Sequence, residues 1–140
     1  MGVAVLIAIG VGLAIAVQAS ILGGASRSVH PLTVSFALQV AGVLLGLAWV
    51  GYSRAWSSVL EVIGQWWWLP LGLIGLVVVA ALGFSSARIG ALQTLALVVA
   101  AQLIAALALD LFNGAISVDI RQPAGVALVV GGVLLISSRS

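Results

Sequence analysis

Five polar side chains within or at the end of the long apolar runs of this sequence are candidates to line a path for a solute. They are Gln18, Gln39, Thr94, Gln102 and Asp110. An amide in an apolar medium costs a few kcal/mol when it has no partner, so such side chains face another helix or a cavity. Neutral hydrogen-bonding groups would suit a path for a neutral, zwitterionic or amphipathic solute. The alternative interpretation is that the amides only hydrogen-bond between helices.

Three of these residues lie in one run at multiples of about four residues. Thr94, Gln102 and Asp110 follow this spacing, with Ala106 between the last two. On a helix, that spacing gives a stripe that drifts slowly around the axis. The stripe leads from the interior to the interface, and Asp110 ends it at the mouth of the predicted path. A salt bridge from Asp110 to Arg121, or to another Arg at the membrane surface, is the alternative role.

Catalytic chemistry finds no support in the sequence. The one histidine, His30, precedes Pro31 without a nearby acid, and the chain has no cysteine. Neither a Gly-rich phosphate loop nor a set of metal ligands occurs. We therefore expect no enzyme, no cofactor and no metal site. No carboxylate lies deep within an apolar run either, which argues against proton exchange through a membrane-embedded acid.

The composition indicates what surrounds these residues. Of 140 residues, 64% are hydrophobic and 6% are charged, whereas about a quarter of a soluble domain is charged. This excludes a soluble globular protein, a disordered chain and a nucleic-acid binder, and leaves the lipid bilayer as the partner. The five Arg are far apart in the sequence, so we expect no basic patch for DNA or lipid headgroups.

Charged and turn-forming residues divide the chain into five apolar runs. A membrane helix needs about 20 apolar residues, and the runs extend over about 2–22, 32–52, 67–84, 89–109 and 123–136. They are apolar on every side and twice the length of a barrel strand, which has about 10 residues. The sequence therefore predicts an all-α fold, a single five-span transmembrane domain over 1–140. The first run has no preceding Arg or Lys, so we expect it to be kept and not cleaved as a signal peptide.

A less apolar segment, about 55–66, separates the second run from the third. Apolar residues recur on one side of it at helical spacing: Trp56, Val59, Leu60 and Ile63. This pattern is typical of a short helix lying in the headgroup region. Trp66, Trp67 and Trp68 follow, and indole rings favour the interface. We expect them to anchor the third helix at its depth, with ligand contact as the alternative.

Small residues at helical spacing mark candidate packing faces, because membrane helices associate by close backbone approach. They are Gly42 and Gly46 in the second run, Gly72 and Gly75 in the third, and Ala127 and Gly131 in the fifth. They predict a tightly packed bundle or dimer but identify no partner.

The arginines leave the orientation nearly undecided. With five spans the termini lie on opposite sides, which places two Arg on the N-terminal side and three on the other. They are Arg54 and Arg121 against Arg27, Arg88 and Arg139. The side richer in Arg faces the cytoplasm, so one interpretation is a weak preference for the C-terminus inside. The other is insertion in both orientations, with two copies forming an antiparallel ten-helix dimer.

Several short motifs resemble one family. They are Trp66-Trp67, 72–75 (GLIG), 89–91 (IGA), 101–104 (AQLI) and 109–112 (LDLF). In order and spacing they are similar to the YdcZ-like family of the drug/metabolite transporter superfamily, over about 6–136. The resemblance implies a half-size, multi-pass protein of the bacterial inner membrane that pairs antiparallel with itself or a close paralogue. Leu22 and Gln39 depart from the Asn or Ser common in the family, which implies altered specificity if those positions touch substrate.

We therefore expect a small-molecule transporter that works by alternating access across an antiparallel dimer interface. The competing class is a non-transporting scaffold or accessory subunit of a larger membrane complex, in which the packing faces matter and the polar stripe does not.

Overall fold

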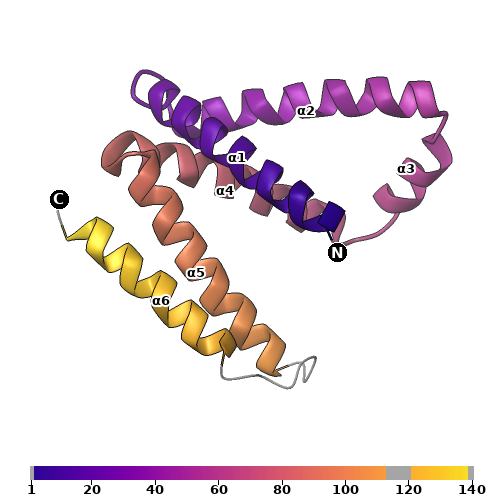
Figure 1. The fold of residues 1–140 in the computed structure, drawn as a ribbon. Coiled ribbons are helices and arrows are strands. Elements are labelled where there is room, and N and C mark those ends of the chain that lie inside the picture. The colour runs from indigo at the N-terminus through magenta and orange to yellow at the C-terminus, as the bar shows by residue number, and fades with distance from the viewer. Residues whose placement is uncertain (1, 113–120, 139–140) are drawn as a thin grey trace.

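A computed structural model describes residues 2–112 and 121–138 of the chain (Figure 1). Helices account for nearly all of this part, in the order α1 (Gly2–Ala25), α2 (Pro31–Ser53), α3 (Trp56–Ile63), α4 (Trp68–Ile89), α5 (Ala91–Phe112) and α6 (Arg121–Ser137). The described residues contain no strand, so the predicted all-α fold is confirmed. Arg139, one of the charges weighed for orientation, lies outside the described residues.

Four of the helices are long and apolar enough to cross a membrane. They are α1, α2, α4 and α5, each of at least 22 residues. The fifth apolar run forms α6, which has 17 residues and a length of about 26 Å. That is shorter than a hydrocarbon core of about 30 Å. The structure thus supports four spans by length and composition, and the fifth stays a prediction.

Helices α1 and α4 continue past the ends expected at Leu22 and Phe84, and α5 continues past Leu109 to Phe112. Gly23 and Gly24 lie within α1, and Ser85 and Ser86 lie within α4. The physical reason is contact between these two helices. A Cβ at Gly23 would lie 2.9 Å from the Cβ of Ser86 and 3.1 Å from its carbonyl oxygen. Glycine and serine weaken an isolated helix, but at this crossing these small residues allow the backbones of α1 and α4 to approach each other closely.

The buried side chains gather where α1 crosses α4. Ala19 and Leu22 on α1, and Ala80 on α4, are almost fully buried. Helix α2 joins the same group through Ser35, whose hydroxyl donates a 2.7 Å hydrogen bond to the carbonyl oxygen of Leu76 in α4. Helices α1, α2 and α4 therefore form one packed group around α4 (Figure 1).

Helices α5 and α6 form a hairpin that diverges from this group (Figure 1). A single residue, Gly90, separates α4 from α5, and its φ of 81° lies in the left-handed region that glycine adopts without a steric penalty. The first half of α5 carries its buried residues, Thr94 and Ala100. The hairpin is consequently attached to the rest of the protein at one end.

Both ends of α2 are capped locally. At its start Pro31 follows His30, whose Nδ1 accepts a hydrogen bond from the backbone N–H of Leu32 at 3.3 Å. At its end Arg54 adopts a φ of 54°, and its N–H donates to the carbonyl oxygen of Val50. The chain then turns directly into α3, which has no buried residue.

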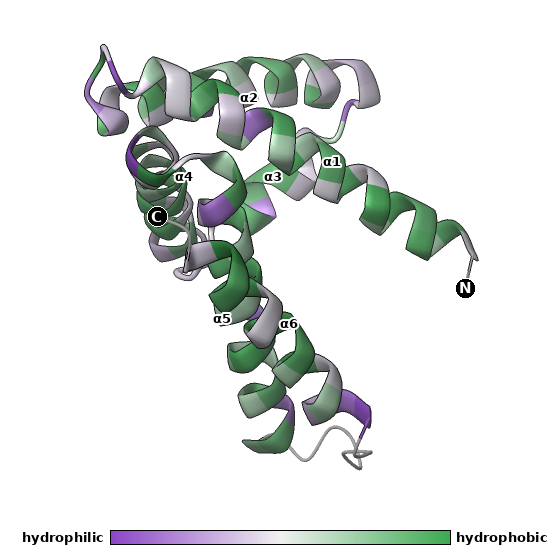
Figure 2. Ribbon diagram, turned by 60° about the vertical axis from the view of Figure 1, so that its left-hand side comes forward, coloured by the Kyte–Doolittle hydropathy of each residue, from purple (hydrophilic) through white to green (hydrophobic). Residues whose placement is uncertain are grey.

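Most large apolar side chains of the protein are exposed. Hydrophobic residues make up most of the long helices, and a few hydrophilic ones lie within them and in the turns (Figure 2). Such a surface is suited to contact with lipid or with another membrane helix, and not with water.

Candidate substrate pathway

The five residues of the predicted path are distributed over three helices. Gln18 lies on α1, Gln39 on α2, and Thr94, Gln102 and Asp110 on α5. The three glutamines are exposed, Asp110 is half-buried and Thr94 is almost fully buried. The three amides thus lie on exposed surface of otherwise apolar helices (Figure 2).

None of the three glutamine amides has a hydrogen-bond partner within residues 2–112 and 121–138. Gln39 comes nearest to a defined contact, because its Nε2 lies 3.5 Å from where a Cβ on Gly75 of α4 would stand. The absence of a side chain at Gly75 leaves room for this amide between α2 and α4. The interpretation that the amides join helices within one chain is therefore not supported for these residues.

The side chains of Thr94, Gln102 and Asp110 do not share one face of α5. Four residues advance a helix by about 40° beyond a full turn, so Thr94 and Asp110 differ by about 160° around the axis. Accordingly Thr94 is 2% exposed, whereas Gln102 is exposed. The Thr94 hydroxyl donates a 2.8 Å hydrogen bond to the carbonyl oxygen of Gly90, the residue directly before α5. Thr94 thus faces the contact with the other helices, and Gln102 faces away.

A single protomer does not bring the five residues together. Helix α4 contacts both α2 and α5, so Gln39 and the α5 residues lie on helices packed against α4. Asp110 lies in the last turn of α5, at the end of the hairpin remote from α1 and α2 (Figure 1). Arg121 begins α6 at that same end. None of the five residues lines either of the two main cavities of the described chain.

The tryptophans lie at the start of α4, as a membrane anchor requires. Trp66 is the most exposed of the three. Trp68 is the first residue of α4, and its Nε1 donates a 2.7 Å hydrogen bond to the carbonyl oxygen of Ile63, the last residue of α3. This bond ties the two helices together at the turn. The role of the tryptophans as interface anchors stays a prediction.

Most of the glycines predicted to pack helices have open space beside them. A Cβ on Gly42, Gly46, Gly72 or Gly131 would meet nothing within 4 Å. A Cβ on Gly75 would meet only Gln39. The positions Gly42, Gly46, Gly72 and Gly131 therefore do not pack within the described protomer, whereas Gly75 accommodates Gln39 of α2.

The glycines that do form a tight contact are not among those predicted to pack. They are Gly23 on α1 and Gly83 on α4, both buried. A Cβ on Gly83 would stand 2.6 Å from the Oγ of Ser26. Ala19 and Gly23 have the four-residue spacing of small residues, but α1 holds other pairs with this spacing, such as Gly10 and Ala14, so the sequence alone does not identify the contact face.

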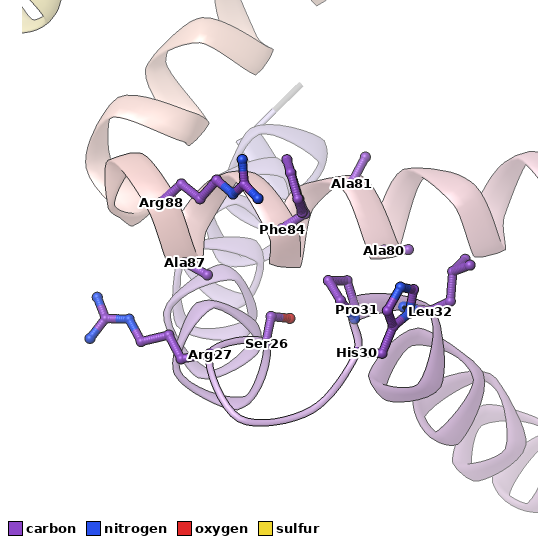
Figure 3. Close-up of a pocket in the computed structure, with 10 residues that line it drawn as sticks. All are labelled: Ser26, Arg27, His30, Pro31, Leu32, Ala80, Ala81, Phe84, Ala87 and Arg88. Atoms are coloured by element: carbon purple, nitrogen blue, oxygen red, sulfur yellow. Dashed lines mark hydrogen bonds between the residues drawn. The ribbon is translucent and has the colours of Figure 1, made fainter.

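The larger of the two cavities, about 670 Å³, lies where the end of α1 and the start of α2 meet the last turns of α4 (Figure 3). It is lined by both Arg27 and Arg88. These residues are far apart in sequence, and the packing of α1 on α4 brings both to the lining of one cavity. The smaller cavity, about 360 Å³, is an apolar groove between α5 and α6.

Comparison with known proteins gives one family. A family model described as "Putative inner membrane exporter, YdcZ" matches residues 3–135. No curated protein and no solved structure matches the chain. Among the described residues, no group of three His, Cys, Asp or Glu side chains is placed to hold a metal ion.

Proposed function

We propose, because this chain belongs to the YdcZ family of inner membrane exporters, that two copies of it export a small solute by alternating access. The protein is a multi-pass protein of the inner membrane. In the proposed dimer the copies run antiparallel, and the solute path lies between them.

The observation that carries this proposal is that three glutamines on apolar helices are exposed and lack hydrogen-bond partners among the described residues. Gln18, Gln39 and Gln102 are exposed on apolar helices and have no hydrogen-bond partner within the described part of the chain. Facing lipid, each amide would remain unsatisfied at a cost of a few kcal/mol. A partner copy that encloses them around a polar path removes that cost, whereas one copy alone does not.

The substrate class follows from the same groups. The exposed amides offer donors and acceptors without charge, and no acid of the described chain lies in the middle of a long helix. Such a lining suits a neutral, zwitterionic or amphipathic solute. Asp110, at a helix end, would stand at the mouth of the path.

Flux through the purified protein in liposomes tests the proposal. A panel of isotope-labelled neutral and zwitterionic solutes is loaded, and efflux is compared with protein-free liposomes. We expect Gln102→Ala to reduce efflux about tenfold, because a lost polar contact to a solute costs on the order of 1–2 kcal/mol. Asp110→Asn should reduce efflux less, because it keeps the hydrogen-bonding shape.

Gln122→Ala is the matched control, since Gln122 is an exposed glutamine at the start of α6 outside the proposed path. Unchanged efflux in both Gln102→Ala and Asp110→Asn would exclude this path. Absence of flux together with obligatory co-purification of another membrane protein would favour the accessory subunit instead.

A further inference from the structure

The larger cavity differs from the proposed path in both place and chemistry. It opens between the α1–α2 turn and the last turns of α4 (Figure 3), and none of the five path residues lines it. Its volume of about 670 Å³ falls in the range of ordinary ligand sites. We propose that this cavity binds the anionic headgroup of a membrane phospholipid.

The charge of the cavity selects an anion. Arg27 follows α1, Arg88 lies in the last turn of α4, and both line the site. No acidic side chain is among its lining residues. The described acids, Glu61 and Asp110, lie on α3 and in the last turn of α5. Guanidinium groups offer forked pairs of donors that match phosphate oxygens.

A hydroxyl lies beside the cavity but packs against α4. The Oγ of Ser26 is buried and has no hydrogen-bond partner within the described residues, and a Cβ on Gly83 would stand 2.6 Å from it. Figure 3 shows this oxygen directed toward Pro31 and not out along Arg27. Because the oxygen is closed off by Gly83, we assign the recognition of the anion to the arginines and not to Ser26.

The remaining wall is apolar and favours a lipid over a soluble anion. Leu32, Ala80, Ala81 and Phe84 line the site, and Leu32 and Phe84 are also exposed on the outer surface. An acyl chain could therefore continue from the cavity along the helices. The Cζ of Arg88 lies 4.0 Å from the centroid of the Phe84 ring, and this cation–π contact holds the charge above the apolar wall.

The depth of the site fits a headgroup. Both arginines lie at helix ends, where long basic side chains reach the polar interface. The turn between α1 and α2 and the end of α4 together form the rim (Figure 3). A phosphate held there would keep its acyl chains in the hydrocarbon region, parallel to α4.

Native mass spectrometry of the purified protein in detergent tests the proposal. The probes are phosphatidylglycerol, phosphatidylcholine with the same acyl chains, and glycerol 3-phosphate. We expect the protein to retain phosphatidylglycerol over phosphatidylcholine, and Arg27→Gln with Arg88→Gln to weaken that retention about tenfold or more. Ser26→Ala should leave the retention nearly unchanged, because the Ser26 Oγ is closed off from the cavity.

Arg54→Gln is the matched control for Arg88→Gln, because Arg54 is an exposed arginine at the opposite end of α2 and does not line the cavity. An equal loss of phosphatidylglycerol retention in Arg88→Gln and Arg54→Gln would overturn the site, because it would show only a general effect of the protein's charge. Equal retention of the two phospholipids would overturn anion recognition. Binding of glycerol 3-phosphate as tight as that of phosphatidylglycerol would overturn the lipid as the source. Helicity measured by circular dichroism verifies that each variant is folded.

Discussion

The Ser35 hydroxyl is the clearest polar link between two helices of this protein. Ser35 is fully buried, and its Oγ donates to the carbonyl oxygen of Leu76 at 2.7 Å. Replacement by Ala removes the donor and leaves a small void. We expect Ser35→Ala to lower the free energy of unfolding by about 0.5–1 kcal/mol, measured by loss of helicity on titration with a denaturing detergent.

Ser53→Ala is the matched control for this experiment. Ser53 is exposed, and its hydroxyl donates within its own helix, to the carbonyl oxygen of Trp49 at 2.8 Å. Its replacement should leave the unfolding free energy nearly unchanged. A loss in Ser53→Ala as large as that in Ser35→Ala would show that the bond between helices carries no special weight.

At the residue scale, the sequence identifies amides more readily than hydroxyls. A glutamine within an apolar run is conspicuous because its amide has few partners there, and Gln18, Gln39 and Gln102 stand out on this ground. A serine hydroxyl can bond to a carbonyl oxygen of its own helix, so Ser35 gives no such signal. Arg27 and Arg88 line one cavity because α1 packs on α4. The spacing of residues in the sequence does not predict that packing.

At the element scale, the crossing of α1 and α4 depends on two glycines whose surroundings differ. A Cβ on Gly23 would meet the Cβ of Ser86 at 2.9 Å and its carbonyl carbon at 3.0 Å, so the helices themselves must separate. A Cβ on Gly83 would meet chiefly the Oγ of Ser26, at 2.6 Å, which can rotate away. We expect Gly23→Ala to destabilise by about 1–3 kcal/mol and Gly83→Ala by less.

Thermal unfolding of the three variants Gly23→Ala, Gly83→Ala and Gly10→Ala measures this order. A Cβ on Gly10 would meet nothing within 4 Å, and Gly10 belongs to no proposed packing face. The change there should be neutral or slightly stabilising, because Ala is the better helix former. A Gly23→Ala protein as stable as Gly10→Ala would contradict the close crossing.

The positions of the helices are more predictable from the sequence than their ends. Apolar length alone indicates the regions of α1, α2, α4 and α5, because lipid demands long apolar helices. The ends differ where tertiary contact overrides local preference, as at Gly23 in α1 and Ser86 in α4. The amphipathic spacing of Trp56 to Ile63 likewise corresponds to α3.

At the scale of the whole molecule, the protomer is open. Helices α1, α2 and α4 form one group, and the hairpin of α5 and α6 extends from it (Figure 1). The glutamines of the proposed path, and the small-residue face at Gly42 and Gly46, lie on exposed surface. Because the arginines favour neither orientation strongly, a second copy in the opposite orientation is the simplest way to cover them.

The opposite orientation of the two copies is testable because the chain has no cysteine, so each introduced cysteine is unique. Ser28 and Ser57 are exposed and lie beyond opposite ends of α2, which is about 35 Å long. In spheroplasts treated with a membrane-impermeant maleimide, we expect Ser28→Cys and Ser57→Cys each to be labelled to about half of the level reached after permeabilisation, because the arginines impose almost no bias. Full labelling of one variant and none of the other would establish a single orientation and contradict the antiparallel dimer.

If both are half-labelled, a short bis-maleimide should join Ser28→Cys to Ser57→Cys in cells that express both, since an antiparallel pair places these two positions on the same side of the membrane.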